Sequence, residues 1–496
     1  MREKSAMWHE EKLMIDGQLR AAEGGGVFET VNPATEEVLG VAANATDADA
    51  QAAVAAARRA FDTTDWARNH EFRAHCLRQF HAAMERRLEE MRELTVTEVG
   101  APVMLTYGAF GAQLEGPVGM VKWVADMMDG YQWSEELGVV EFDGVNHRRW
   151  IEREALGVVA AITAYNFPVQ LNLAKLAPSL AAGNTVVLKG APDTPWSALA
   201  LGRLIAEETD IPPGVVNILT SAENSVGEVL TTHPDVDMVT FTGSTATGRK
   251  IMAAASATVK KTFLELGGKS AFLVLDDADV EAAAAMNSFM VCTHAGQGCS
   301  IPTRLLVPAS MADTAAEVVA GTLANLPYGD PTDPGTMMGP LINARQRDKV
   351  HKMVDDAVEQ GAKLVAGGKR PDHLPEGYYY EPTVLAGVDE NDSVAQQEVF
   401  GPVLAIIGYE GGDDEAVRIA NNSIYGLSGS VNSADPERAR AVARRIRSGT
   451  MSVNGGLYYA PDAPFGGYKQ SGNGREMGVA GFEELLEIKT LAEPAA

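Results

Sequence analysis

From residue 157 onward, short runs of β-branched and aliphatic residues alternate with longer helix-like segments, and this alternation limits the possible folds more than any other feature. The runs are Val-Val-Ala-Ala-Ile at 158–162, Thr-Val-Val-Leu at 185–188, Val-Val-Asn-Ile-Leu at 215–219 and Met-Val-Thr-Phe at 238–241. Strands that alternate with helices form parallel sheets covered on both faces. We therefore predict an α/β fold with a nucleotide-binding type of sheet.

A second alternation follows residue 262. It contains Ala-Phe-Leu-Val-Leu at 271–275, a helix from about residue 279 and Arg-Leu-Leu-Val at 304–307, and it continues to about residue 457. This pattern predicts a second α/β domain. Ahead of both, residues 47–98 are rich in Ala, Arg and Glu, with apolar positions at helical spacing over 50–61 and 74–94, and we predict long surface helices there.

A polar-faced hairpin is predicted between the early helices and the first sheet. Its strands cover 138–142 and 147–152, and Asp143-Gly144 is a residue pair typical of a two-residue hairpin turn. A hairpin that projects from the body offers a surface to a second subunit.

Charge and cysteine content exclude several classes of function. Lys and Arg number 41 against 67 Asp and Glu, so the net charge of −26 repels phosphate backbones and anionic membranes. We expect no nucleic-acid partner, no signal peptide and no membrane span, since no run of about 18 apolar residues occurs. Cys76, Cys292 and Cys299 are too few for a disulfide framework and lack metal-ligand spacing, which predicts a cytoplasmic protein without a metal.

Cys299 and Glu265 are the candidate catalytic pair. Cys299 follows Gly-Gln-Gly at 296–298, a setting that allows close approach of another molecule, whereas structural cysteines usually have apolar neighbours. A thiol is a good nucleophile as thiolate, and a nearby carboxylate could serve as its general base. The pair therefore indicates covalent catalysis.

Other segments are ambiguous when read alone. The stretch Phe-Thr-Gly-Ser-Thr-Ala-Thr-Gly at 241–248 is either a tight strand-to-helix turn or a phosphate site at a helix start. Lys189, at the end of an apolar strand, is either a surface lysine or a cofactor ligand. Asn166 is either a turn residue or a donor to an oxyanion, placed where open α/β sheets bind their ligands.

Six segments in this order resemble the aldehyde dehydrogenase superfamily. They are Tyr-Asn-Phe-Pro at 165–168, Phe-Thr-Gly-Ser at 241–244, Leu-Glu-Leu-Gly-Gly-Lys at 264–269, Gly-Gln-Gly-Cys at 296–299, Glu-Val-Phe-Gly-Pro at 398–402 and Pro-Phe-Gly-Gly-Tyr-Lys at 464–469. Their order and spacing match the family over about residues 13–490.

The resemblance implies catalytic roles. Cys299 would attack the aldehyde carbon, Asn166 and the Cys299 N–H would hold the thiohemiacetal oxyanion, and Glu265 would activate the water that hydrolyses the thioester. The family's proton relay falls on Lys175 and Glu476.

It also implies a dinucleotide site for NAD, with NADP possible. Lys189 would reach the adenosine ribose, Ser244 the pyrophosphate and Glu398 the nicotinamide ribose, with Phe400 packing nearby. The matched motifs contribute further cofactor-binding positions, namely Gly243, Gly248, Glu265, Leu266 and Gly267.

Many relatives that prefer NAD carry a glutamate three residues after this lysine, where this chain has Pro192. Asp193 could reach the same ribose hydroxyls, so we favour NAD and keep NADP open.

The implied architecture has two parallel-sheet α/β domains and a small β oligomerisation unit. Residues 1–126 and 151–263 would form the cofactor-binding domain, 264–463 the catalytic domain, and 127–150 with 464–496 the oligomerisation segments of a homodimer or homotetramer.

The small-molecule aldehyde is less defined. The resemblance places Gln170, Ala174, Leu457, Tyr458 and Tyr459 along the substrate tunnel. An aromatic-rimmed, mainly apolar tunnel favours a medium or bulky apolar or aromatic aldehyde, although these residues could simply pack together.

Two other functions are alternatives. A semialdehyde dehydrogenase that transfers the acyl group to CoA usually lacks the glutamate base, and Glu265 is present. A catalytically silent structural or binding member would be expected to have lost Cys299 or Asn166, and both remain. Whether Cys292 modulates Cys299 through a disulfide is an open question, with inert packing as the alternative.

Overall fold

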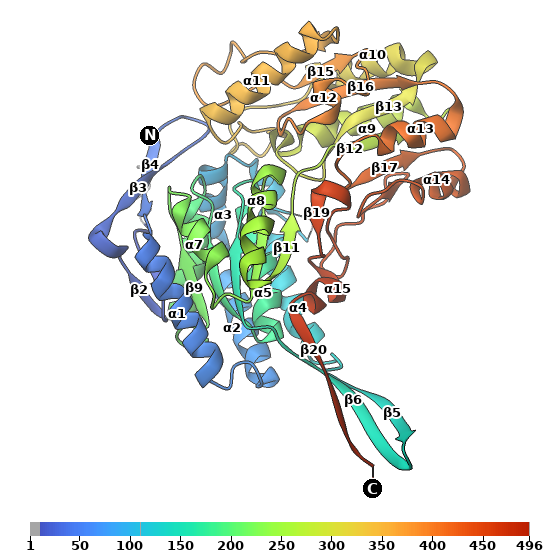
Figure 1. The fold of residues 1–496 in the computed structure, drawn as a ribbon. Helices are drawn as coiled ribbons and strands as arrows, with labels where there is room; N and C mark the ends of the chain where they lie inside the picture. The colour runs from blue at the N-terminus through green and yellow to red at the C-terminus, as the bar shows by residue number, and fades with distance from the viewer. Residues whose placement is uncertain (1–9, 110, 496) are drawn as a thin grey trace.

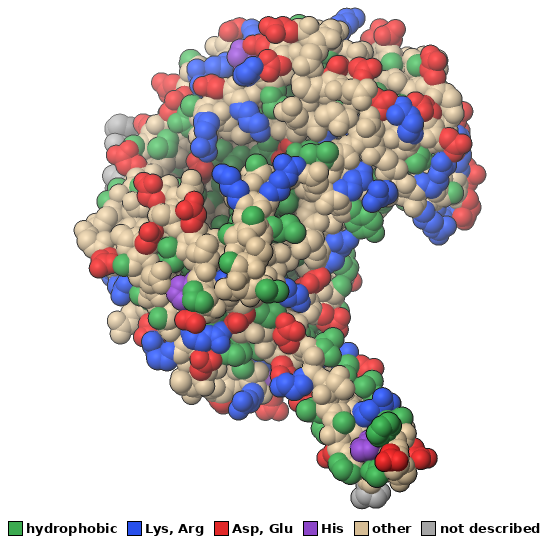
Figure 2. Space-filling model, in the orientation of Figure 1, with side chains coloured by type: hydrophobic (Ala, Val, Ile, Leu, Met, Phe, Trp, Pro, Cys, Tyr) green, Lys and Arg blue, Asp and Glu red, His purple; other side chains and the backbone are tan. Residues whose placement is uncertain are grey.

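The computed structural model describes residues 10–109 and 111–495, which form two lobes and a projecting arm (Figure 1). Each lobe is built on one large sheet with its own hydrophobic core. On the face drawn in Figure 2, the surface between the lobes is hollowed, with hydrophobic side chains in the hollow and Lys and Arg side chains at its rim. The α/β prediction is confirmed.

The first lobe contains an eight-stranded sheet with strand order β19-β11-β10-β7-β8-β9-β1-β2. Its five central strands are parallel: β7 (Val158–Ile162), β8 (Thr185–Lys189), β9 (Val216–Leu219), β10 (Met238–Thr242) and β11 (Lys261–Glu265). The chain runs outward from β7 to β8 and β9 and then crosses back to β10, so the sheet changes direction between β7 and β10. Open α/β sheets bind ligands beyond the carboxyl ends of the strands at such a point.

Short antiparallel strands close the two edges of this sheet: β1 (Leu13–Ile15), β2 (Gln18–Arg20) and β19 (Gly472–Asn473). The helices around it are α1 (Asp47–Thr63), α2 (His70–Arg86), α3 (Leu88–Val99), α4 (Glu115–Met128), α5 (Pro168–Ala182), α6 (Pro195–Glu208), α7 (Ser225–Thr232) and α8 (Thr245–Ala255). A hairpin of β3 (Val27–Val31) and β4 (Val38–Ala43) lies near the N-terminal end.

The predicted early helices are present, but the helical spacing over 74–94 belongs to two helices. Helix α2 ends at Arg86 and α3 begins at Leu88. Neither Gly nor Pro marks this break, so no local signal announces it. One face of each helix is buried, so the description as surface helices holds for the other face only.

The second lobe contains a seven-stranded sheet with strand order β14-β15-β16-β13-β12-β17-β18. The edge strand β14 (Lys363–Ala366) is antiparallel to its neighbour. The other strands are parallel: β12 (Ser270–Val274), β13 (Pro302–Pro308), β15 (Thr383–Ala386), β16 (Val403–Tyr409), β17 (Gly429–Asn432) and β18 (Ser452–Val453). Its helices are α9 (Val280–Cys292), α10 (Ala312–Ala324), α11 (Ala344–Glu359), α12 (Ser393–Gln396), α13 (Gly412–Asn421) and α14 (Pro436–Ala443).

The arm is a three-stranded antiparallel sheet made by β5 (Ser134–Phe142), β6 (Val145–Ala155) and β20 (Leu486–Pro494). The predicted hairpin is confirmed, since Asp143 and Gly144 form its turn with φ of 52° and 78°. Positive φ at both positions is the requirement of a type I′ turn. The C-terminal strand β20 follows the short helix α15 (Gly478–Glu483) and pairs along β6 (Figure 1).

Single-turn 3₁₀ helices complete the described structure: η1 (Glu23–Gly25), η2 (Val103–Thr106), η3 (Ser256–Thr258), η4 (Thr293–Gly296), η5 (Ala309–Met311) and η6 (Lys469–Ser471). Across residues 10–109 and 111–495, every helix is too short or too polar to cross a lipid bilayer.

Candidate active site

Cys299 lies in a strained loop that joins η4 to β13. Three successive residues just before it adopt left-handed backbone, with φ of 47° at His294, 53° at Ala295 and 71° at Gly296. A Cβ at Gly296 would lie 2.1 Å from the carbonyl oxygen of Gly401, so this close approach requires glycine. The Cys299 side chain is half-buried and packs against the core of the first lobe. Such strain persists only where surrounding contacts hold it.

Gln297 supplies those contacts. Its Oε1 accepts a hydrogen bond from the Ile342 N–H at 3.0 Å, and its Nε2 donates to the carbonyls of His294 at 3.2 Å and Pro340 at 3.3 Å. The side chain is fully buried. Sequence reasoning treated Gln297 only as a polar neighbour of the thiol, because its partners are backbone atoms distant in sequence.

Asn166 follows β7 at the point where the sheet changes direction. Its Nδ2 donates to the backbone carbonyl of Gln297 over 2.8 Å, and its own carbonyl accepts from Gln113 Nε2 at 2.9 Å. All three side chains are buried. The amide of Asn166 is therefore fixed beside the thiol loop, with one of its two N–H groups left for an oxyanion. Gln113 was not singled out from the sequence.

Glu265 ends β11 and is buried, with 1% of its side chain exposed. Its Oε1 has no hydrogen-bond partner. Burial, reinforced by the negative charge of Glu476, raises the pKa of Glu265 to about 8, while the nearby thiol of Cys299 and the charge of Lys175 act in the opposite direction. Burial and then the charge of Glu265 raise the pKa of the Cys299 thiol well above its usual value. The two groups therefore share a protonated resting state at neutral pH.

Lys175 and Glu476 form a buried ion pair, with Nζ 3.3 Å from Oε2. Lys175 comes from α5, and its ammonium lies 5.2 Å from the ring centroid of Phe263. A small cavity borders the pair, and Ser179, whose Oγ is buried without a partner, also lines it. The two predicted relay residues are thus in contact, and the charges of both act on the pKa of Glu265.

Lys189, the last residue of β8, is 7% exposed. Burial lowers the pKa of its ammonium to about 8. Lys189 is thus a mostly buried cation at the carboxyl end of the first sheet. The phenolic oxygen of Tyr165 is buried without a hydrogen-bond partner among the described residues, and the charges of Asp193 and Glu398 act on it.

Ser244 caps α8, and its exposed Oγ accepts from the Thr247 N–H at 3.2 Å. Gly243 precedes it directly after β10. Gly248 permits close packing of the helix, since a Cβ there would lie 2.6 Å from Leu266 Cδ2, and Leu266 is buried. These glycines thus serve the packing of the first turn of α8 onto the sheet.

Glu398 is held by the glycine pair that follows Glu265. Its Oε1 accepts from the Gly268 N–H at 2.9 Å, and a Cβ at Gly267 would lie 2.5 Å from its Oε2. Phe400, two residues on, has φ of 59°, and its ring meets that of Tyr165 edge-on at 6.0 Å.

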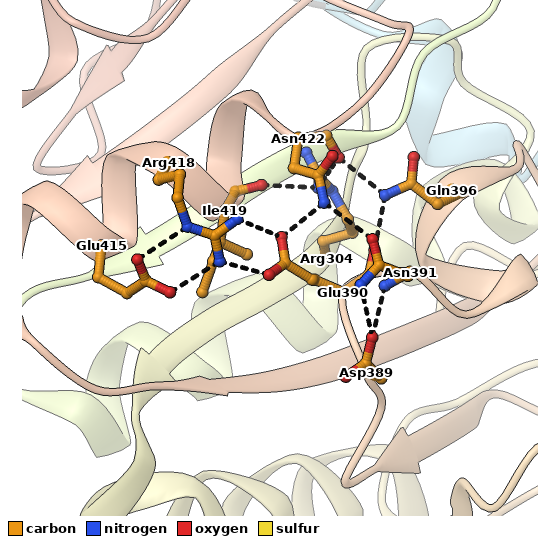
Figure 3. Close-up of polar contacts among 9 residues, drawn as sticks. All are labelled: Arg304, Asp389, Glu390, Asn391, Gln396, Glu415, Arg418, Ile419 and Asn422. Atoms are coloured by element: carbon orange, nitrogen blue, oxygen red, sulfur yellow. Dashed lines mark hydrogen bonds and ion pairs between the residues drawn. The ribbon is translucent and has the colours of Figure 1, made fainter.

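A polar network braces the segment leading to Glu398 (Figure 3). Gln396 Nε2 donates to the carbonyls of Glu390 at 2.6 Å and Asn422 at 2.8 Å, while Arg418 pairs with Glu390 and Glu415. The buried Arg304 donates to the carbonyls of Ile419, Ala420 and Lys269. Arg304 thereby joins this network to the turn that holds Glu398.

Lys269 was also missed by sequence reasoning. Its side chain is 1% exposed, and its Nζ has no hydrogen-bond partner. Burial lowers the pKa of this ammonium to about 7, with Arg304 acting in the same direction and Glu398 in the opposite one.

The predicted substrate residues fall into two groups. Gln170 and Ala174 are buried in α5, and Ala174 also borders the Lys175–Glu476 cavity. Leu457 is 67% exposed, whereas Tyr458 and Tyr459 are half-buried against the first core. The Tyr459 ring lies 6.3 Å from that of Phe465, a residue that sequence reasoning did not assign to the site.

Pro192 is exposed, and Asp193 beside it accepts a hydrogen bond from Asn343 Nδ2 at 2.8 Å. Cys292 is buried in the second core, where burial raises the pKa of its thiol to about 12. It therefore remains a protonated packing residue at neutral pH.

Comparison with known proteins agrees with this geometry. The model of the aldehyde dehydrogenase family matches residues 20–491. A curated relative, the 3-succinoylsemialdehyde-pyridine dehydrogenase of Pseudomonas sp, is 42% identical over 484 residues, which cover 97% of this chain and 98% of the relative.

Solved structures give the same result. An aldehyde dehydrogenase of Mycobacterium tuberculosis complexed with NAD+ superimposes with a TM-score of 0.92 at 40% identity, covering 98% of each chain. A mutant of aldehyde dehydrogenase C from Pseudomonas syringae, complexed with NAD+ and octanal, gives 0.91 at 39% identity, covering 97% of this chain and 96% of that chain. The resemblance found in the sequence is confirmed, and the chain belongs to the aldehyde dehydrogenase family.

Proposed function

We propose that the protein oxidises an aldehyde to a carboxylic acid with NAD+ through a thioester on Cys299. The observation that carries the proposal is the convergence of the thiol loop, the fixed amide of Asn166 and the buried carboxyl of Glu265. Covalent catalysis of this kind replaces one difficult oxidation by two easier steps.

In the first step, Sγ of Cys299 bonds to the aldehyde carbon, and the thiol proton moves to the fraction of Glu265 that is ionised. The carbonyl oxygen becomes an oxyanion, and the free N–H of Asn166 and the backbone N–H of Cys299 stabilise it. Bound NAD+ would supply the hydride acceptor, and loss of hydride from this carbon with return of the C=O bond would leave a thioester on Cys299.

In the second step, water attacks the thioester carbon while Glu265 accepts a proton from it. The carbon–sulfur bond breaks, the acid leaves, and Cys299 is regenerated. The ion pair of Lys175 and Glu476 and the cavity behind it provide a route by which protons leave the buried Glu265.

The residues fit a dinucleotide. The Tyr165 hydroxyl is a buried donor without a partner among the described residues, Lys189 is a mostly buried cation, and Glu398 uses Oε1 to hold Gly268 while its Oε2 lies beside Gly267. The structural relatives named above are NAD+ complexes. We assign the adenosine ribose to Lys189, the pyrophosphate to Ser244 and the glycines around it, and the nicotinamide ribose to Glu398 with Phe400.

We favour NAD over NADP because Asp193 places a carboxylate near the end of β8, where it would repel a 2′-phosphate. Its Oδ1 is engaged by Asn343, which leaves Oδ2 for a ribose hydroxyl.

For the substrate, we propose a medium or bulky apolar or aromatic aldehyde. Tyr459 and Phe465 supply aromatic surface near the thiol. Burial raises the pKa of the Tyr459 hydroxyl, and the charges of Glu476, Cys299 and Glu265 raise it further, which places this ring beside the catalytic groups. Two of the relatives support this proposal, since one is named for 3-succinoylsemialdehyde-pyridine and the other is complexed with octanal.

Assembly as a homodimer or homotetramer is part of the proposal. The arm exposes apolar side chains to solvent, with exposed fractions of 75% at Phe142, 60% at Val139 and 64% at Ile488. The division into cofactor-binding, catalytic and oligomerisation segments is likewise proposed, although β19, from the last of these, pairs with β11 of the first sheet. Three free cysteines agree with a reducing cytoplasmic setting.

The experiment is to follow formation of the reduced cofactor with aliphatic, aromatic and amino aldehydes, using NAD and NADP side by side without CoA. Turnover would establish the hydrolytic reaction and rank both cofactors and aldehydes. Activity that appears only with CoA would replace water by CoA as the acyl acceptor, and silence under both conditions would favour a non-catalytic role.

A further inference from the structure

The loop at 339–343, directly before α11, contacts both halves of the proposed site. It reaches the thiol loop through Gln297, which bonds to Pro340 and Ile342. It reaches the loop after β8 through Asn343, which bonds to Asp193. Three residues within one run of four, Pro340, Ile342 and Asn343, thus join two sites on different lobes.

At the thiol end, this chain of hydrogen bonds leads to Asn166, the proposed oxyanion donor. Gln297 holds the strained backbone before Cys299, and its carbonyl fixes the amide of Asn166 at 2.8 Å. A shift of Ile342 therefore moves the group that orients Asn166.

At the cofactor end, Asn343 has two functions. Its Nδ2 donates to Asp193 at 2.8 Å, and its Oδ1 caps α11 by accepting from the Gln346 N–H at 2.9 Å. Gln346 in turn donates to the carbonyls of Val399 at 3.1 Å and Phe400 at 2.8 Å, next to Glu398. Through Gln346, two hydrogen bonds thus connect Asn343 to the proposed nicotinamide-ribose segment.

We propose that Asn343 is a positioning residue that couples occupation of the dinucleotide site to the geometry of the thiol site. A ligand that orders Asp193 orders Asn343, and through Ile342 and Gln297 it orders Asn166 and Cys299. By linkage, an effect of NAD on the thiol site implies an equal effect of the thiol site on NAD affinity. The inference rests on the proposed use of NAD.

The test is a double-mutant cycle of Asn343→Asp and Asp193→Asn, measured by equilibrium binding of NAD in calorimetry. N343D keeps the oxygen that caps α11, because aspartate is a good N-cap, but it replaces the bond to Asp193 by repulsion between two carboxylates. In the double variant, the amide at position 193 can donate to the carboxylate at position 343, so the hydrogen bond can form again. We expect N343D to weaken NAD binding about tenfold alone and to cause no further loss in the D193N background.

The second readout is the rate at which iodoacetamide alkylates Cys299, measured by mass spectrometry with and without NAD. In the wild type NAD should change this rate by several-fold; in N343D the ratio should approach one, and in the double variant it should return toward the wild-type value. N343S, which keeps a capping oxygen and lacks the amide donor, should repeat the loss if N343D folds poorly.

Equal costs of N343D in both backgrounds, or an unchanged alkylation ratio, would overturn the coupling. Failure of the proposed function would differ, because absence of aldehyde turnover leaves both the binding cycle and the alkylation ratio measurable. If D193N alone abolished NAD binding and the double variant regained none, Asp193 would act by direct contact and Asn343 would not be the coupling residue.

Discussion

The side-chain amide of Asn166 donates to the backbone carbonyl of Gln297, two residues before the thiol, over 2.8 Å. One N–H of the amide is thereby used for orientation, and the other is available to the oxyanion of the proposed mechanism. A donor fixed before the reaction needs no reorganisation during it.

Replacing Asn166 with alanine should therefore lower kcat for aldehyde oxidation about 100- to 1,000-fold, the usual effect of losing one oxyanion donor. NAD affinity should change little, because the side chain faces the thiol loop. Steady-state kinetics together with calorimetry would separate the two quantities. A parallel loss of NAD binding would contradict a role confined to the oxyanion.

Replacing Cys299 with alanine should abolish turnover and leave NAD binding nearly intact. The half-buried thiol interacts with the carboxyl of Glu265, which itself belongs to the site, so replacing the thiol should disturb the rest of the fold little. Reduced-cofactor formation and calorimetry measure the two effects. The matched control is Cys292→Ala. This variant loses a buried packing thiol but retains Cys299, so it should still turn over aldehyde. Retained turnover in the Cys299 variant would exclude the thioester route.

Much of this site could be predicted because its elements are encoded locally. Runs such as 158–162 predict strands by their β-branched content, and Asp143-Gly144 specifies its turn. Cys299 and Glu265 could be predicted as catalytic residues because a thiol and a carboxylate are evident from the residue types in their motifs.

The contacts that orient these residues could not be predicted in the same way. Gln113 and Asn166, Gln297 and Ile342, and Asp193 and Asn343 are each distant in sequence. In the first two pairs one partner is a backbone atom, which every residue possesses, so residue identity gives no signal. The break between α2 and α3 at Arg87 was also not predictable, because no Gly or Pro marks it.

The pH dependence of the hydrolytic step should follow Glu265. Because burial raises its pKa to about 8, the carboxyl is mainly protonated at pH 7 and gains its basic form as pH rises. We expect kcat to increase by up to about tenfold per pH unit below this pKa and to level off above it when hydrolysis limits turnover.

Glu265→Gln should remove this limb of the profile. It also removes one of the charges that raise the pKa of the Cys299 thiol, so at alkaline pH the thiol can ionise without this base and the acyl-enzyme should accumulate, which intact-protein mass spectrometry would detect. Glutamine matches the shape of the side chain and cannot accept the proton of water. A variant that shows the same pH limb and no acyl-enzyme would assign the base to another group.

The arm should hold subunits together through its apolar side chains. Phe142 is 75% exposed at the end of β5, beside the hairpin turn, where an isolated chain gains nothing from a phenyl ring in water. Phe142→Asp should therefore shift sedimentation toward smaller species at a given concentration and leave the far-ultraviolet circular dichroism spectrum unchanged. As a matched control, Val259→Asp alters a residue that is 90% exposed outside the arm and should leave the sedimentation profile as it was. A wild-type protein that sediments only as a monomer would remove the basis for assigning the arm to assembly.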